Sequence, residues 1–294
     1  MTDWAIETTK LGHRFGSNWA VRGLDLQVPR GSVFGLLGEN GVGKSTTIQM
    51  LIGQLLPTEG SANVLGLDPV TDEVAIKTRV GYVPEKYGFY EYMRIREIIA
   101  LVAAYHSDWN HDLQRQLIGE FSLNENNRVS ELSKGMRAKL ALLMALSFEP
   151  EMLLLDEPAS GLDPAARRNF IETILSRYQQ TGKTILLSSH LLNDFAGLLD
   201  HVAFMRDGKI DLVAPLEQLQ RQMKRVRLVF EDGIPESLHV NGSIKTSVNG
   251  REAVATVEHF DAERTMVELK ALNPSHIIVE DLSLEDIFVA RTGA

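Results

Sequence analysis

The chain has 294 residues, of which 44% are hydrophobic and 23% are charged, with a formal net charge of −9 and no cysteine. This length accommodates one large α/β domain and a small additional domain. The absence of cysteine excludes disulfides and thiolate metal sites, and an acidic chain without a long Lys/Arg block argues against a nucleic-acid partner.

The sequence predicts neither a leader peptide nor a membrane-spanning segment. Residues 1–4 lack the basic start and apolar stretch of a signal peptide. No apolar run reaches the roughly 18 to 20 residues that are needed to cross a bilayer. We therefore expect a soluble chain that needs a partner for any work at a membrane.

The N-terminal region predicts strands around a glycine-rich loop. Alternating apolar residues over 5–7 and 24–28 are typical of half-buried strands, and the apolar run 32–37 predicts a short buried strand. Residues 38–45 follow the pattern G-x-x-x-x-G-K-S, and apolar residues at helical spacing predict a helix over 44–54. The loop thus opens a helix, whose N-terminal dipole favours anions.

This loop has the residue types that bind a nucleotide triphosphate. Successive backbone N–H groups surround the phosphates, the Lys44 ammonium reaches the β and γ oxygens, and the Ser45 hydroxyl reaches Mg²⁺. A glycine-rich connection that matches the pattern by chance is the alternative. The predicted phosphate-binding residues are Gly38, Glu39, Asn40, Gly41, Val42, Gly43, Lys44, Ser45 and Thr46.

Helical periodicity dominates residues 86–148. Apolar residues recur at helical spacing over 95–102 and 113–121, and a long amphipathic helix is predicted over 137–148. Four aromatic residues precede the first helix within six positions, among residues that break any apolar period. We expect some of these rings to form an exposed docking surface, with a core role as the alternative. They are Tyr87, Phe89, Tyr90 and Tyr92.

A second nucleotide-binding segment is predicted at residues 152–157. Its apolar run is typical of a strand buried on both faces, and it delivers Asp156 and Glu157 at the carboxyl end, where open α/β sheets bind ligands. A phosphate-binding loop needs a metal-binding acid from a neighbouring strand. We therefore expect Asp156 to hold Mg²⁺ and Glu157 to polarise the attacking water; two solvated loop acids are the alternative.

The rest of the chain alternates strands and helices. Further strands are predicted at 184–188 and 202–206, with helices at 165–178 and 191–199, which is typical of a parallel sheet. Beyond residue 213 the sequence predicts a small α/β extension. A packing or dimerisation role and a ligand-sensing role are both open for it. Its predicted elements are strands at 225–230, 253–257 and 277–279 and a helix at 284–291.

The motifs resemble, in order and spacing, those of the ATP-binding subunit of ABC transporters, from about Ile6 to Gly208. Residues 132–136, Leu-Ser-Lys-Gly-Met, are similar to the signature motif LSGGQ, and residues 160–163, Ser-Gly-Leu-Asp, are similar to the D-loop. Phe15 matches an aromatic residue that stacks on adenine, Glu85 occupies the Q-loop position, and His190 matches the switch histidine.

The resemblance implies an α/β fold: a P-loop NTPase core of the ABC type with an antiparallel β part (1–85 and 149–213), a helical signature subdomain (86–148) and a small C-terminal α/β extension (214–294). It also implies roles for site residues. Glu157, His190 and Lys44 would be catalytic. Ser45, Asp156 and Glu85 would hold Mg²⁺. Phe15 would contact the ATP that its own chain binds. The ATP bound by a second copy would be contacted by Ser133, Gly135, Met136 and Asp163.

Three of these residues have structural explanations as well. Ser133 can cap the helix that follows it, and Asp163 directly before Pro164 has the pattern of a helix N-cap. His190 alone could be a structural residue at a strand end. Both kinds of role are compatible, because a capped helix start still has free N–H groups when an anion arrives.

The chain departs from the family pattern at three positions. Lys134 replaces the first glycine of the signature motif, Met136 replaces its glutamine, and Glu85 replaces the Q-loop glutamine. Ser133 and Gly135 are retained, so we expect a competent signature motif. Glu85 can still ligate Mg²⁺ through a water molecule. We expect the replacement to alter the step that couples ATP hydrolysis to the partner.

The resemblance implies an ATPase that dimerises on ATP, with a second copy or a paralogous subunit, and drives a separately encoded membrane permease. Among ABC transporters, the subunits of ABC-2 exporters resemble this chain most. The features that carry this resemblance are the signature motif with Lys134, residues 107–109 and residues 282–289. Such a subunit would be cytoplasmic and peripheral on the inner face of the cell membrane. A soluble ABC-type ATPase of an assembly or repair system is the alternative. An ATP-binding regulator without hydrolysis would lack Glu157 or His190, and both are present.

Overall fold

The computed structural model describes residues 3–174, 182–231, 233–235 and 238–292. The chain forms two compact units, a larger one of residues 1–190 and 201–213 and a smaller one of residues 191–200 and 214–294. Sequence reasoning also places a boundary after residue 213, but it assigns 191–200 to the core. In the structure this segment belongs to the smaller unit, where Asn193 hydrogen-bonds to Glu285.

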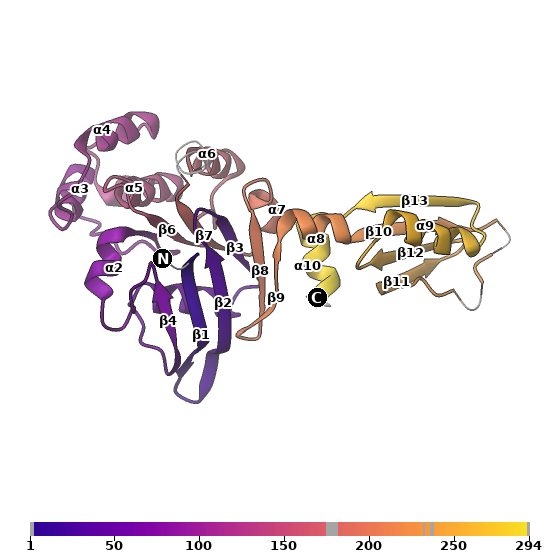
Figure 1. The fold of residues 1–294 in the computed structure, drawn as a ribbon. Helices are drawn as coiled ribbons and strands as arrows, with labels where there is room; N and C mark the ends of the chain where they lie inside the picture. The colour runs from indigo at the N-terminus through magenta and orange to yellow at the C-terminus, as the bar shows by residue number, and fades with distance from the viewer. Residues whose placement is uncertain (1–2, 175–181, 232, 236–237, 293–294) are drawn as a thin grey trace. The chain divides into compact units, whose positions relative to one another are not determined.

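A six-stranded sheet forms the centre of the larger unit (Figure 1). Its order is β5-β6-β7-β3-β8-β9, and neighbouring strands from β5 to β8 pair in parallel. All residues of β3, β6 and β7 are buried, which confirms the buried strands that the apolar runs predict. The strands are β3 (Val33–Leu37), β5 (Val80–Val83), β6 (Met152–Asp156), β7 (Thr184–Ser189), β8 (His201–Arg206) and β9 (Lys209–Pro215).

An antiparallel sheet of order β2-β1-β4 packs against the same core. Its strands are β1 (Trp4–Phe15), β2 (Asn18–Pro29) and β4 (Glu59–Val64). Ile6 and Leu24 from this sheet share one hydrophobic cluster with Phe34 of β3 and with Ile48 of helix α1 (Lys44–Leu51). The cluster holds α1, and with it the glycine-rich loop, between the two sheets.

Helices of the larger unit confirm the predicted helical region. The helix predicted over 137–148 begins earlier, at Lys134, because Ser133 caps it. The helix predicted over 165–178 is described as far as Ile174, and 175–178 lie outside the described residues. Helices α3, α4 and α5 gather at one end of the unit in Figure 1. The helices are α2 (Glu73–Arg79), α3 (Ile95–Ala103), α4 (His111–Glu120), the 3₁₀ turn η1 (Val129–Glu131), α5 (Lys134–Leu146) and α6 (Pro164–Ile174).

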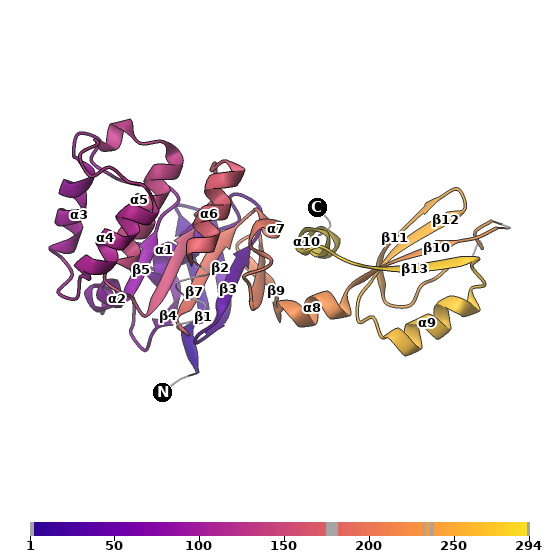
Figure 2. The ribbon, with the colours of Figure 1, turned by 90° about the horizontal axis from the view of Figure 1, so that it is seen from above.

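The smaller unit contains an antiparallel sheet of order β11-β12-β10-β13. Figure 2 shows α9 along one face of this sheet, where Leu269 packs with Val226, Leu228 and Ala255. Sequence reasoning did not find α8, β11 or α9. The elements are α7 (Leu192–Phe195), α8 (Leu216–Gln222), β10 (Lys224–Val229), β11 (Ser243–Asn249), β12 (Glu252–Val257), α9 (Ala262–Ala271), β13 (His276–Asp281) and α10 (Leu284–Thr292).

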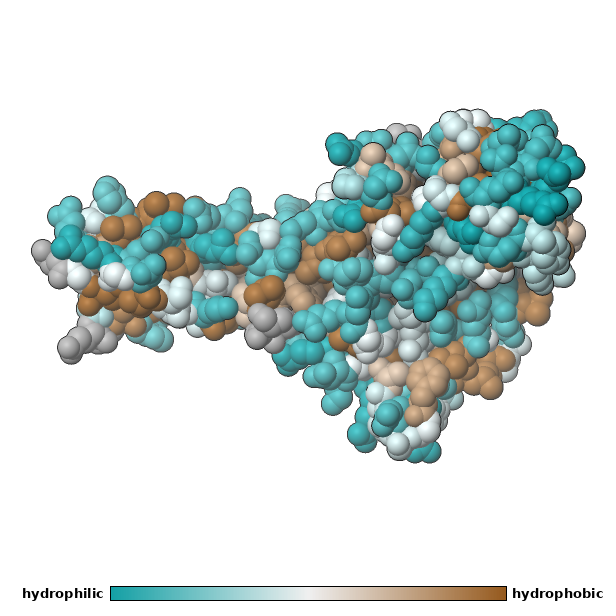
Figure 3. Space-filling model, turned by 180° about the vertical axis from the view of Figure 1, so that it is seen from behind, coloured by the Kyte–Doolittle hydropathy of each residue, from teal (hydrophilic) through white to brown (hydrophobic). Residues whose placement is uncertain are grey.

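Among the helices of the described residues, none has both the length and the apolarity that a membrane crossing requires. On the face shown in Figure 3, hydrophilic side chains surround the apolar clusters of the described residues.

Candidate functional site

The carboxyl ends of three adjacent strands meet at one edge of the six-stranded sheet. Asp156 at the end of β6 pairs in register with Ser188 of β7, and Leu37 at the end of β3 pairs with Ser189. The Gly38 amide donates to the Ser189 carbonyl at 3.3 Å. The sheet register therefore brings the glycine-rich loop, the two acids and the residues before His190 to one place.

The glycine-rich loop needs its glycines for two different reasons. Gly43 has a φ of 107°, and a Cβ added there would lie 2.4 Å from the Ala20 carbonyl oxygen. Gly41 has a φ of 83°, but an added Cβ would meet nothing within 4 Å. The chain therefore packs closely behind Gly43, while the space in front of Gly41 is open to a ligand.

A cavity of about 330 Å³ lies over this loop. Backbone amides and a helix N-terminus facing a cavity form an anion-binding site. The cavity is lined by Asn40, Gly41, Gly43, Lys44, Ser45 and Thr46 of the loop and by Ala20, Glu85 and Glu157.

Lys44 is buried beside this cavity and is held from three directions. Its Nζ donates to the Gly38 carbonyl at 2.7 Å and to the Glu39 carbonyl at 2.9 Å. It also lies 2.9 Å from Glu157 Oε1. That oxygen has no hydrogen-bond partner of good geometry, so the contact between Lys44 and Glu157 is an ion pair.

Asp156 is a buried acceptor of two hydroxyl hydrogen bonds. Ser45 Oγ donates to Asp156 Oδ1 at 2.9 Å, and Ser188 Oγ donates to the same oxygen at 2.7 Å. Burial raises the pKa of Asp156, although the hydrogen bonds from Ser188 and Ser45 oppose the shift. Ser188 also accepts from the Glu157 amide at 2.9 Å, so one hydroxyl holds both acids. Sequence reasoning did not select Ser188.

The second oxygen of Glu157 contacts His190. His190 Nδ1 lies 2.7 Å from Glu157 Oε2, and the His190 amide donates to the same oxygen at 3.4 Å. Glu157 has a φ of 46°, in the left-handed region that residues other than glycine seldom adopt. Such an outlier is typical of functional sites. Lys44, Glu157 and His190 therefore form one connected chain of contacts, of which Lys44 and Glu157 line the cavity.

Glu85 follows β5 and lines the same cavity with an exposed side chain. Burial raises the pKa of the neighbouring Tyr82, and the negative charges of Asp156 and Glu85 raise it further. Hydroxyl and carboxylate oxygens are the donors that Mg²⁺ prefers. Ser45, Asp156 and Glu85 carry such oxygens: Ser45 and Glu85 line the cavity, and Ser45 is hydrogen-bonded to Asp156.

Comparison with known proteins decides the family. Residues 21–160 match the family model described as "ABC transporter". The uncharacterised ABC transporter ATP-binding protein YhaQ of Bacillus subtilis (strain 168) is 33% identical over 290 residues, which are 95% of this chain and 96% of YhaQ. This chain belongs to the ATP-binding subunits of ABC transporters. It binds and hydrolyses ATP, as the ABC ATPase fold and its nucleotide-binding loop require.

Two further comparisons agree with this family. The Nod factor export ATP-binding protein I of Burkholderia lata is 32% identical, over 98% of this chain and 97% of that protein. A solved structure, "Structure of ATP binding subunit of ABC transporter", is 27% identical, covers 74% of this chain and 92% of its own, and superposes with a TM-score of 0.66.

The signature residues of this ABC ATPase lie at the start of α5 and do not line the cavity. Ser133 Oγ accepts from the Met136 amide at 3.2 Å, which confirms the predicted cap. Ser133 is exposed, and Gly135 and Met136 are half-buried. In the same way Asp163 Oδ1 accepts from the first amides of α6, at 3.0 and 2.9 Å. Within one chain the signature residues and the glycine-rich loop therefore do not share a cavity.

Phe15 lies at the end of β1 with 56% of its surface exposed. Its ring contacts His13 edge to face, with centroids 4.6 Å apart. It does not line the phosphate cavity, but an exposed ring is available to stack on a base.

The four aromatic residues after Glu85 divide into two pairs. Tyr87 and Phe89 are half-buried and stack on each other, and burial raises the pKa of Tyr87 to about 12. Tyr90 and Tyr92 are 53% and 71% exposed, as expected for part of the cluster. Glu91 between them accepts from Arg137 of α5 at 2.8 Å, and this guanidinium lowers the pKa of Glu91.

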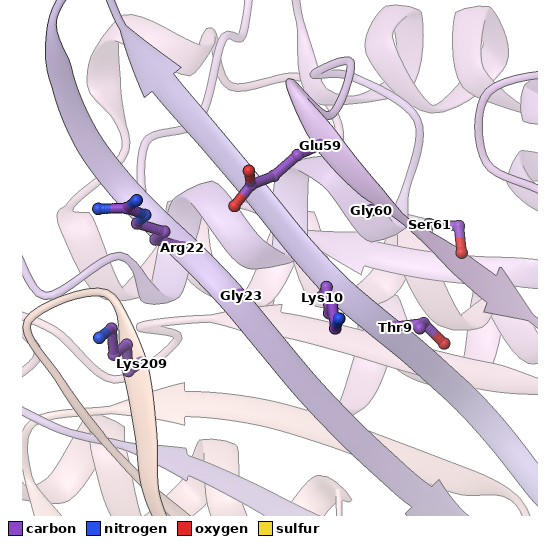
Figure 4. A pocket seen from close by; sticks show the side chains of 8 residues that line it. All are labelled: Thr9, Lys10, Arg22, Gly23, Glu59, Gly60, Ser61 and Lys209. Carbon is purple, nitrogen blue, oxygen red and sulfur yellow. The ribbon is translucent and has the colours of Figure 1, made fainter.

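A larger hollow of the larger unit lies elsewhere, on the antiparallel sheet and β9. Figure 4 shows it lined by Lys10, Arg22, Lys209 and Glu59 among other residues. It measures about 850 Å³ and is wide open. It contains none of the predicted site residues, so size alone does not identify the site; the chemistry of the smaller cavity does.

Proposed function

We propose that this chain is the ATP-hydrolysing subunit of an ABC-2 exporter, acting as a pair of copies that enclose ATP and drive a separately encoded permease. The chain of contacts from Lys44 through Glu157 to His190 supports this most directly. Lys44 and Glu157 line one cavity, and His190 contacts Glu157 from behind it; a cation, a carboxylate and an imidazole are the set of groups that we expect ATP hydrolysis to use.

In this proposal Lys44 changes partners when ATP binds. The β and γ phosphates offer it more negative charge than Glu157 does, and their binding frees Glu157 Oε1. The freed carboxylate then orients the attacking water and accepts its proton. His190, held at 2.7 Å from Oε2, keeps the carboxylate in position and contacts the γ-phosphate. We infer that Glu157, His190 and Lys44 are the catalytic residues.

We infer that Ser45, Asp156 and Glu85 hold Mg²⁺. When bound, this ion would neutralise charge on the phosphate oxygens. Ser188 orients Asp156 by its hydrogen bond at 2.7 Å, so the metal-binding oxygen has a fixed direction before nucleotide arrives.

The position of the signature residues at the start of α5 is the reason why the proposal requires two copies. Loop residues between Asn40 and Thr46 line the cavity, whereas Ser133, Gly135 and Met136 at the start of α5 do not. A second copy, in head-to-tail arrangement, would bring its α5 N-terminus to the γ-phosphate and its Asp163 to the interface. ATP drives closure because it binds the closed pair better than the open one.

An exporter role is supported by the Nod factor export relative, which is similar over nearly its whole length. In this proposal the permease binds the substrate. Tyr90 and Tyr92 are the exposed rings that we assign to permease docking. We therefore place the chain in the cytoplasm, on the inner face of the cell membrane.

Substitution of Glu157 with Gln tests the proposal. We expect E157Q to bind ATP, to lose at least about 100-fold in turnover, as is typical when a general base is removed, and to accumulate as a dimer with ATP and Mg²⁺. Light scattering after size-exclusion chromatography measures the dimer, and phosphate release measures turnover. Normal turnover, or an ATP-saturated E157Q that stays monomeric, contradicts the proposal.

A further inference from the structure

The four-stranded sheet of the smaller unit has one protected edge and one open edge. Edge strands expose unpaired N–H and C=O groups, and proteins usually protect them with lysines or bulges. β11, at one border of the sheet in Figure 1, has both: Lys245, and a register shift between Ser243 and Lys245. β13 lies at the other border. Among the strands of the described residues it pairs only with β10, without a register shift. Its outer edge is therefore open to a further strand.

The residues of β13 favour such pairing. The strand reads His-Ile-Ile-Val-Glu-Asp over 276–281 and contains no lysine, proline or glycine. Three β-branched residues in succession are typical of a strand. Ile278 and Val279 point to opposite faces of the sheet and are 44% and 37% exposed. Apolar surface thus lies on both faces beside the open edge, where an added strand would cover it.

The order of these residues is self-complementary. When two copies of β13 pair antiparallel about a two-fold axis through Ile278, residues of the same face lie opposite each other. Ile278 then lies opposite Ile278 of the second copy. On one face Ile277 lies opposite Val279, and on the other His276 lies opposite Glu280. An axis through Val279 would instead place Ile278 opposite Glu280. One register therefore pairs apolar with apolar side chains and an imidazole with a carboxylate.

The Glu280 carboxylate is available for this contact. Its Oε2 lies 3.9 Å from Arg227 Nη2, at the limit of an ion pair, whereas Arg227 Nη1 lies 3.0 Å from Glu252 Oε1. The Glu280 side chain is 41% exposed, and His276 is exposed as well. The two ends of the strand can therefore attract each other across the axis, while the centre is apolar.

We propose that β13 joins two copies of this chain by antiparallel pairing with itself, so that their two four-stranded sheets form one continuous sheet. All residues of this surface belong to the smaller unit, and the pairing needs no nucleotide. It therefore goes beyond the proposed function, in which ATP brings the copies together. Pairing of β13 keeps the two copies associated between rounds of hydrolysis.

The absence of cysteine from the chain allows a direct test of the register. Oxidation of nucleotide-free I278C should give a disulfide-linked dimer, because the Cβ atoms of directly opposite residues lie about 5 Å apart, close to the range of a disulfide. His276→Cys and Glu280→Cys should link little on their own but should link when mixed, because each lies opposite the other across the axis. Val248→Cys on β11, 59% exposed, is the control and should stay unlinked.

A charge at the centre of β13 should separate the copies. Ile278→Lys places two like charges opposite each other and removes an apolar pair, so we expect nucleotide-free dimerisation to weaken at least about tenfold. Val248→Lys makes the same change on β11 and should leave dimerisation unchanged. Both positions are exposed, so both variants should fold, and the thermal midpoint checks this. Sedimentation velocity over a concentration series measures the dimer.

The results distinguish failure of this inference from failure of the proposed function. If I278C links no better than V248C, or if I278K dimerises as the parent does, pairing through β13 is overturned. An ATP-bound E157Q that still dimerises would leave the proposed function intact in that case. Conversely, linked I278C together with an E157Q that gains no further association from ATP supports pairing through β13 and overturns the ATP-driven closure alone.

Discussion

Lys44 Nζ and Glu157 Oε1 lie 2.9 Å apart, with only 5% and 7% of the two side chains exposed. The group that would bind the γ-phosphate and the group that would activate water thus neutralise each other before nucleotide binds. Because a buried charge is costly without its partner, each depends on the other or on a ligand.

Lys44→Met removes the cation and leaves Glu157 buried. We expect the free energy of unfolding to fall by about 3 kcal/mol, the usual cost of breaking a buried pair. The K44M/E157Q double variant lacks both charges and should recover most of the loss. Urea unfolding of the nucleotide-free proteins measures this; equal destabilisation of the single and double variants would show that the ion pair is not the cause.

Asp156→Asn should stabilise the nucleotide-free protein while it removes a proposed Mg²⁺ ligand. Burial raises the pKa of Asp156 above its ordinary 3.8, so the folded state binds this proton more tightly than the unfolded state. Stability from this group is therefore highest below pH 3.8 and falls as the pH rises through the folded pKa. D156N removes that penalty, and its amide oxygen can still accept from Ser45 and Ser188.

The measurement for D156N is the thermal midpoint of the larger unfolding transition. At pH 7 we expect a rise of about 2–4 °C, which corresponds to about 1 kcal/mol in a domain of this size. The gain should shrink as the pH is lowered toward 4, and ATP turnover should be lost. A gain that is independent of pH would contradict the role of the Asp156 charge.

Gly41→Ala and Gly43→Ala should differ although both glycines have positive φ. A Cβ at Gly43 would clash with the Ala20 carbonyl at 2.4 Å, whereas Gly41 faces open space. We expect G41A to cost about 1 kcal/mol of stability, from backbone strain alone, and G43A to cost clearly more. Both should lose ATP affinity. Denaturation and nucleotide titration measure the two effects, and equal costs in stability would refute this reading of the loop.

We expect Tyr90 and Tyr92 to be required for binding the membrane partner but not for folding. Because both rings are largely exposed, we expect the Y90A/Y92A variant to change stability by less than about 0.5 kcal/mol. Its recovery with a membrane polypeptide from detergent-solubilised membranes should fall at least about fivefold, roughly the 1 kcal/mol that a contact residue contributes. Tyr105→Ala, which removes another exposed ring, is the control. Undiminished recovery, or recovery with a non-membrane scaffold, would contradict docking to a permease.

Residues of the proposed nucleotide site were predictable where a local pattern requires a specific residue type. Residues 38–45 follow the glycine-rich pattern of a phosphate-binding loop, and Asp156 ends an unbroken apolar strand. Ser188 was not predictable, because a serine within a buried strand has no pattern of its own. Only the register of β6 and β7 shows that it lies opposite Asp156.

The smaller unit was less predictable for a related reason. Almost every residue of β11 is exposed, so this strand lacks the apolar alternation that predicts strands from sequence. The grouping of residues 191–200 depends on contacts with residues more than 80 positions later, such as Glu285. Local periodicity has no information about such distant partners.

The peptide bond between His190 and Leu191 is one of three points at which the chain passes between the two compact units. A fragment that stops at residue 213 would retain the imidazole but would lose α10, which contacts α7, the helix that carries the buried Leu192 and Phe195. The rate of phosphate release by such a shortened ATPase would then reflect a displaced His190 rather than the native site. Kinetic work on this protein therefore requires the full chain.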